Sequence, residues 1–185
     1  REILALFPGS RRQEIRRHLT HFVEAGSRLR RQRPGLQVVL AQAEAIQLDL
    51  PANSDVTTVR DGRALLTHAR AAIVKAGTST LEAALAGTPF VVAYRTHPWT
   101  YWLARRLVRV DHVALANLVA GSRVVPEILQ REVTAEALAS AVAPMFEAGE
   151  ERLQILSGLA RIREGLGSPG AAERVAALAE EVLGP

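Results

Sequence analysis

Residues Ala71–Glu82 read AAIVKAGTSTLE, a short apolar strand that stops at Gly77 and turns directly into a helix. A helix that begins this way exposes unpaired backbone N–H groups and the positive end of its dipole, and a glycine lets an anion approach the backbone closely. Glu82, one turn into the helix, would then reach a sugar hydroxyl. The alternative is a capping box, in which Ser79 and Glu82 satisfy each other's backbone donors and bind nothing. This stretch alone supports both interpretations equally.

A second junction of the same kind lies near the start of the chain, where residues 4–14 read LALFPGSRRQE. In a doubly wound sheet of the usual order, the first and fourth strands lie side by side, and ligands bind beyond their carboxyl ends. At that edge we therefore expect the residues of both turns, namely Gly9, Ser10, Arg11, Gly77, Thr78 and Ser79. We predict a phosphate-bearing ligand there, with Arg11 as a forked donor unless it is only a solvated surface residue. Lys75 either helps to neutralise that ligand or points to solvent.

Up to Asn117, apolar runs of strand length alternate with helical patterns. The predicted strands are Ile3–Phe7, Leu36–Ala41, Val56–Arg60, Ala71–Lys75, Phe90–Tyr94 and Val113–Ala116, and the predicted helices are at 12–33, 44–49, 62–69, 79–87 and 98–109. Strands that are apolar throughout and separated by helices indicate a parallel sheet covered on both faces. The pattern therefore predicts an α/β fold, a Rossmann-like doubly wound parallel sheet of six strands.

After Asn117 the alternation gives way to a helical tail, predicted at 125–130, 134–148, 150–165 and 170–183. The stretch Gly167–Gly170 (GSPG) sets the last helix apart. We expect a domain over residues 1–168 and a C-terminal helix over 169–185 that packs either on a neighbouring domain or on its own sheet. Since the chain begins directly before a strand, without an initiator methionine or a signal peptide, we also expect an N-terminal part to be missing.

Composition excludes several classes of function. The 185 residues contain no cysteine, and the five histidines have no metal-ligand spacing, so we expect neither disulfides nor a metal site. Neither GxGxxG nor GxxxxGK[ST] is present, which disfavours NAD enzymes and P-loop nucleotidases. The net charge of +4 comes almost entirely from arginine, which suits phosphates, although genomic base composition also explains it. No apolar run approaches the roughly 18 residues of a spanning helix.

Several segments, in order along most of the chain, resemble the lipid-A-disaccharide synthase family. They are residues 6–14 (LFPGSRRQE), 77–85 (GTSTLEAAL), 87–95 (GTPFVVAYR), 100–108 (TYWLARRLV), 115–121 (LANLVAG) and 125–130 (VPEILQ). The last two are specific to that family. Sugar-nucleotide epimerases and other two-domain glycosyltransferases share only a looser Gly-Thr/Ser-x-x-x-Glu theme.

The resemblance implies a GT-B architecture, in which two Rossmann-like domains face a cleft and the C-terminal domain holds the sugar nucleotide. This chain would be that C-terminal half. The family transfers 2,3-diacylglucosamine from UDP-2,3-diacylglucosamine to 2,3-diacylglucosamine 1-phosphate, forming the β-1,6 disaccharide of lipid A and UDP. The resemblance implies an inverting enzyme that needs no metal and no cofactor, so fixed protein donors would stabilise the leaving diphosphate.

On the same basis, the residues expected to bind the donor substrate can be named. Arg11, with the backbone of Gly9 and Ser10, would meet the diphosphate together with the helix start at Gly77, Thr78 and Ser79. Glu82 would accept hydrogen bonds from the ribose. Asn117, in the LANLVAG segment, is implicated near UDP unless it forms only an Asx-turn, and Arg95 and Arg123 are further candidates. No catalytic base is expected here, because the resemblance places it in the missing N-terminal half.

The partners that follow are the UDP-sugar donor, the lipid acceptor, the missing domain and a membrane surface, at the inner face of the cytoplasmic membrane of a Gram-negative-type bacterium. The sequence leaves open whether the protein forms a homo-oligomer. The basic segment 98–109, which holds both tryptophans, would lie on that membrane or pack as core.

Two departures from the family are Lys75-Ala76 before Gly77 and a short stretch at 41–59. The alternatives are a UDP-N-acetylglucosamine 2-epimerase-like or other GT-B UDP-sugar enzyme and, more distantly, a basic nucleic-acid-binding module, which would leave both glycine turns without a purpose.

Overall fold

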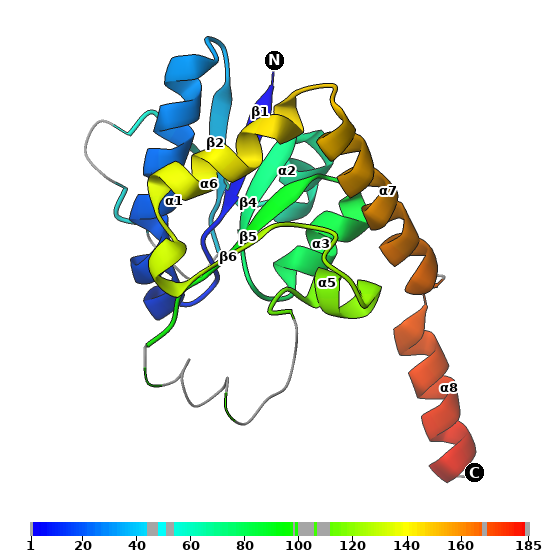
Figure 1. Ribbon diagram of the computed structural model, residues 1–185. Helices are drawn as coiled ribbons and strands as arrows, with labels where there is room; N and C mark the ends of the chain where they lie inside the picture. The colour runs from blue at the N-terminus through cyan, green and yellow to red at the C-terminus, as the bar shows by residue number, and fades with distance from the viewer. Residues whose placement is uncertain are drawn as a thin grey trace.

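The computed structural model describes residues 2–43, 48–50, 54–97, 99, 106, 112–167 and 170–183. Within this part of the chain, six parallel strands form one sheet in the order β3-β2-β1-β4-β5-β6 (Figure 1). They are β1 (Ile3–Phe7), β2 (Gln37–Ala41), β3 (Thr57–Val59), β4 (Ala71–Lys75), β5 (Phe90–Tyr94) and β6 (Glu127–Leu129). The predicted fold class is confirmed, and so is the neighbouring position of the first and fourth strands.

Helices cover both faces of the sheet. They are α1 (Arg12–Gln32), α2 (Gly62–His68), α3 (Ser79–Ala86), α5 (Leu115–Ala120), α6 (Ala135–Val142), α7 (Glu150–Gly165) and α8 (Ala171–Leu183), with single 3-10 turns η1 (Gln130–Glu132) and η2 (Ala143–Phe146). The first face carries α1 and α6, and the second carries α2, α3, α5 and α7. The last helix, α8, extends away from the body of the domain (Figure 1).

The core lies on both sides of the central strands. Residues 4–6 of β1, 71–74 of β4 and 90–93 of β5 have no exposed surface, which is why these strands read as uninterrupted apolar runs. Phe22 of α1 and Leu138 of α6 fill the first face, and Leu66 of α2 and Leu159 of α7 fill the second. The sheet is therefore held rigidly, and the turns at its carboxyl edge inherit fixed positions.

The sixth strand is not where the sequence predicted it. Residues 113–116 were expected to form a strand and 125–130 a helix, but α5 begins at Leu115 and the edge strand is β6. Glu127 explains the exchange, because its carboxylate accepts hydrogen bonds from the backbone N–H groups of Val113 (2.9 Å) and Ala114 (3.0 Å) at the start of α5. Short apolar runs do not distinguish the two structures by periodicity, and this long-range contact decides between them.

The other boundaries differ less. The helix predicted at 134–148 is divided into α6 and η2, with Pro144 in the 3-10 turn, since proline removes a donor that an α-helix needs. Residues 48–50 lie outside any helix, and the rest of the predicted helix 44–49 is outside the described residues. In the predicted helix 98–109 only Trp99 and Arg106 are described; both are helical, and Trp99 is 70% exposed and so is not core.

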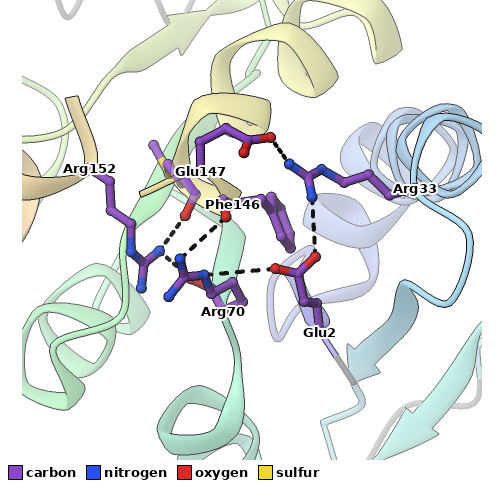
Figure 2. A network of polar contacts seen from close by, with 7 residues as sticks. Glu2, Arg33, Arg70, Phe146, Glu147 and Arg152 are labelled. Atoms are coloured by element: carbon purple, nitrogen blue, oxygen red, sulfur yellow. Dashed lines mark hydrogen bonds and ion pairs between the residues drawn. The ribbon is translucent and has the colours of Figure 1, made fainter. Parts of the chain in front are cut away.

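A polar network closes the amino edge of the sheet, opposite the two predicted turns (Figure 2). Its labelled members are Glu2, Arg33, Arg70, Phe146, Glu147 and Arg152. Arg33 donates to Glu2 (3.2 Å) and to Glu147, and its guanidinium lies over the Phe146 ring, 5.2 Å from the centroid. Arg152 of α7 donates to the backbone carbonyl of Arg70, 2.9 Å away, just before β4. This network joins α1, η2 and α7 to the strand starts and leaves the carboxyl edge open.

Candidate functional site

A cleft of about 620 Å³ opens where β1, β4 and β5 end. Its lining includes five cationic side chains, Arg11, Arg12, Arg17, Lys75 and Arg95, with Glu14 as its one carboxylate among the described residues. The strand register explains why the residues that follow β1 and β4 lie close together, because Phe7 at the end of β1 pairs with Val74 one residue before the end of β4. Such an excess of positive charge at the carboxyl edge of a parallel sheet suits an anionic ligand.

The turn after β1 requires a glycine. Gly9 has a φ of +119°, and a Cβ built on it would lie 2.7 Å from Oε2 and 2.8 Å from Cβ of Glu14. The backbone N–H of Ser10 donates to the same Oε2 at 3.1 Å. Both a left-handed backbone and close packing against Glu14 therefore exclude any other residue at this position.

Glu14 also connects the two predicted turns. Lys75 Nζ donates to Glu14 Oε1 at 2.8 Å, and the two side chains are only 17% and 18% exposed. Burial alone would raise the pKa of Glu14, but the hydrogen bond and charge of Lys75, with the backbone N–H groups of Ser10 and Arg11, lower it overall. Lys75 thus points between the turns and not to solvent. Glu14 is part of the segment 4–14 quoted above, but no role for it was predicted from the sequence. Its place in the first helical turn after a glycine is the feature that could have identified it.

The turn after β4 leaves backbone donors open. The N–H and the hydroxyl of Thr80 both donate to the Gly77 carbonyl, at 3.1 and 2.7 Å. In the described part of the chain, the N–H groups of Gly77, Thr78 and Ser79 have no acceptor. Thr78, at the N-cap position, makes no side-chain cap hydrogen bond, and no Ser79–Glu82 capping box forms among these residues. The alternative offered for this stretch is therefore wrong, and its amides are free for an anion.

The two turns are adjacent but do not line one cavity. Lys75 Nζ lies 3.5 Å from where a Cβ on Gly77 would stand, so it borders both. The cleft itself is lined from the α1 side, and Glu82 is exposed one turn into α3. Arg11 is 84% exposed at the mouth of the cleft, with its guanidinium 3.8 Å from Glu14.

Arg95 is held at the cleft by a histidine that the sequence reasoning set aside. His18 is buried in α1, where its Nε2 accepts the backbone N–H of Arg95 (3.0 Å) and its Nδ1 donates to the Glu14 carbonyl (2.7 Å). These partners assign the neutral tautomer, and burial lowers the pKa of His18. The Arg95 guanidinium donates to His21 Nε2 at 2.6 Å. The feature of the sequence that could have identified His18 is its position on the apolar face of α1.

Asn117 and Arg123 lie elsewhere. Asn117 was placed at the end of a strand, but it is fully buried within α5. Its Oδ1 accepts the N–H groups of Val124 (2.9 Å) and Val125 (3.0 Å), and its Nδ2 donates to Glu127 (2.8 Å). The side chain thus shapes the connection from α5 to β6. Arg123 is exposed and lines a separate cavity of about 330 Å³ against α7.

Among the described residues, no group of three or more His, Cys, Asp or Glu side chains is placed to hold a metal ion. The helices in this part of the chain also include none with the length and apolarity needed to cross a bilayer. The cleft and the turn after β4 offer cationic side chains and backbone amides.

Comparison with known proteins gives one consistent family. The family model described as lipid-A-disaccharide synthetase matches residues 1–180. The lipid-A-disaccharide synthase of Myxococcus xanthus is 46% identical over 98% of this chain and 49% of its own length, and that of Geobacter metallireducens is 41% identical over 100% and 50%. The chain spans about half the length of these curated relatives.

Solved structures agree at the level of the fold. A spinosyn forosaminyltransferase and the calicheamicin glycosyltransferase CalG4 each superpose with a TM-score of 0.64 over 100% of this chain and 44% of theirs, at 16% and 17% identity. The similarity shows that the domain has the fold of one half of a GT-B glycosyltransferase.

Proposed function

The chain belongs to the lipid-A-disaccharide synthase family, and from this premise we propose that it is the donor-binding half of that enzyme. The reaction would move 2,3-diacylglucosamine from its UDP conjugate to 2,3-diacylglucosamine 1-phosphate, with inversion at C1. The acceptor 6-hydroxyl oxygen bonds to C1, the bond from C1 to the diphosphate breaks, and UDP leaves. The hydroxyl proton goes to a base that we place in the half of the enzyme outside this chain.

The observation that carries the proposal is the meeting of the two glycine turns at one edge of the sheet. The free amides of Gly77, Thr78 and Ser79 would bind diphosphate oxygens, and Arg11 and Arg95 would supply charge from the α1 side. Charge develops on the diphosphate as the bond to C1 breaks, so donors that are already in place stabilise the transition state. Glu82, exposed beside these amides, would accept the ribose hydroxyls.

The remaining named residues have different parts in this proposal. Gly9 and Ser10 would shape the first turn around Glu14, and Lys75, paired with that carboxylate, would hold the two turns together. Asn117 would act indirectly, by fixing the α5–β6 connection beside β5. No cofactor or metal enters the proposal.

The last helix supports the expectation of a second domain. Val175, Leu178 and Val182 follow each other at helical spacing on α8 and are 64%, 60% and 84% exposed. We propose that this apolar face packs on the other half of the enzyme, and that the assembled enzyme works peripherally at the inner face of the cytoplasmic membrane.

The direct test is calorimetric titration of the 185-residue chain with UDP. Wild type should bind, whereas Arg11→Ala and Glu82→Ala should each weaken binding about tenfold through loss of one charge-assisted contact. Arg31→Ala is a matched control, because Arg31 is exposed on α1, the helix that follows Arg11, and lines neither the cleft nor the turns. A folded wild-type chain that ignores millimolar UDP would contradict the proposal.

Activity tests the two-domain account. The 185-residue chain alone should make no disaccharide, because the proposal places the base that takes the acceptor proton outside it. The full-length enzyme, given both substrates, should release UDP and disaccharide together. Epimerised UDP-sugar in place of the disaccharide would support the epimerase-like alternative.

A further inference from the structure

A second basic cavity, of about 440 Å³, adjoins the cleft on the outer side of α1. Its lining includes three arginines and two histidines, Arg16, Arg17, His21, Arg95 and His97, and contains no carboxylate among the described residues. Arg17 and Arg95 border both cavities. The cavity differs in this respect from the cleft, whose lining includes Glu14.

The arginines of this cavity form no ion pair among the described residues. Arg30, at the other end of α1, and Arg33, just after that helix, have acidic partners within 4 Å, whereas Arg16, Arg17 and Arg95 have none in the described part of the chain. The nearest polar partner of Arg95 is His21, which accepts its N–H through Nε2. Burial first, and then the charge of Arg95, lower the pKa of His21, and the charge of Glu24 opposes them only in part.

The wall of the cavity is organised before any ligand arrives. Arg17 and His21 are four residues apart in α1, so they lie one above the other on the same face of the helix. The backbone of Arg95 is tied to that helix by buried His18. The fold therefore fixes the backbone positions of these arginines before an anion binds.

We propose that this second cavity binds a phosphate monoester, as a site that adjoins the donor cleft and shares Arg17 and Arg95 with it. Each guanidinium group can donate two hydrogen bonds to such a dianion. Three positive charges with no competing carboxylate are more than a singly charged anion would balance, which favours a dianion. The source is either the 1-phosphate of the acceptor sugar or the headgroup of an anionic lipid. The first assignment rests on the proposed function; the site itself does not.

The test titrates the 185-residue chain with glucosamine 1-phosphate, with and without saturating UDP. We expect binding in both conditions, because Arg16, His21 and His97 line the second cavity and not the cleft. Arg16→Gln should weaken it about tenfold and leave UDP affinity unchanged, because Arg16 lines only the second cavity. Arg31→Gln removes the same charge from an exposed site on α1 and should change neither. Circular dichroism on each variant confirms folding.

A second arm separates the two sources. Phosphatidylcholine vesicles with phosphatidate, a monoester, or with phosphatidylglycerol, a diester, are sedimented with the chain. Binding of phosphatidate but not of glucosamine 1-phosphate, lost in Arg16→Gln, assigns the site to a lipid headgroup. Binding of the sugar phosphate assigns it to the acceptor.

Three results would overturn the inference: no binding of either monoester, equal binding by Arg16→Gln and Arg31→Gln, or full displacement of glucosamine 1-phosphate by UDP. Failure of the proposed function has a different signature. In that case UDP does not bind, while monoester binding that depends on Arg16 persists.

Discussion

Lys75 Nζ lies 2.8 Å from Glu14 Oε1, and this ion pair joins the turn after β4 to the turn after β1 across 61 residues of sequence. Both side chains are more than four-fifths buried, so each charge depends on the other for compensation. The position of the free amides at residues 77–79 relative to the arginines of α1 therefore depends on this contact between the two turns.

Removing one member of this pair should destabilise the domain. Glu14→Gln leaves the Lys75 ammonium partly buried without its counter-ion, and we expect a loss of about 1 to 3 kcal/mol in the free energy of unfolding, measured by urea titration. Lys75→Met in the same chain should recover part of the loss. Glu24→Gln, exposed on the same helix, is the control. Equal stability of wild type and Glu14→Gln would show that the pair contributes nothing.

Gly9→Ala should be more harmful than another glycine substitution with a positive φ. At Gly9 the left-handed backbone and the approach to Glu14 act together, whereas Gly35 has a φ of +92° with nothing within 4 Å of its Cβ position. We expect Gly35→Ala to cost about 1 kcal/mol and Gly9→Ala at least about 2 kcal/mol more, with weaker UDP binding. Similar losses in the two variants would mean that Glu14 moves aside freely.

The stability of the domain should fall in mild acid because of His18. Burial lowers the pKa of His18 below its ordinary value of 6.5, so below that value the unfolded chain binds a proton that the folded chain resists. The His18 contribution is complete above about pH 7 and declines as the pH falls from about 6.5 to the lowered folded value. Thermal unfolding from about pH 8 to about pH 5 measures this decline.

His18→Leu provides the comparison. The variant should be less stable than wild type at neutral pH, because the Arg95 N–H loses its acceptor. Its melting temperature should nevertheless fall less steeply in acid. His68→Leu, on an exposed position of α2, should keep the wild-type slope. An unchanged slope in His18→Leu would assign the acid sensitivity to other groups.

Asn117→Ala should affect stability far more than donor affinity. The substitution leaves the buried N–H groups of Val124 and Val125 without an acceptor, and we expect a loss of about 2 to 4 kcal/mol in the free energy of unfolding. Ser122→Ala, exposed in the same connection, should lose little. If the folded Asn117→Ala chain lost UDP binding at temperatures well below its melting point, Asn117 would contact the ligand after all.

The three strands whose bounds the sequence predicted residue for residue are buried on both faces, and β2 and β3 were predicted to within one residue at an end. β1, β4 and β5 read as continuous apolar runs because helices cover the sheet on both sides, and the glycine turns after β1 and β4 follow from local chemistry. The exchange of strand and helix between residues 113–116 and 125–130 has the opposite cause. β6 is an edge strand, and its carboxylate at Glu127 caps α5 from another part of the chain.

The sequence by itself determined the fold class, the five strands from β1 to β5, and the two glycine turns that meet at one edge, because burial pattern and backbone conformation are local properties. Only the tertiary structure decided what surrounds those turns. Glu14 reaches Lys75, and His18 reaches Arg95 across 77 residues, through contacts between elements that no spacing in the sequence records. The first stretch, Ala71–Glu82, therefore specified a turn with free backbone amides, and the packing of α1 against β4 and β5 supplied its charged surroundings.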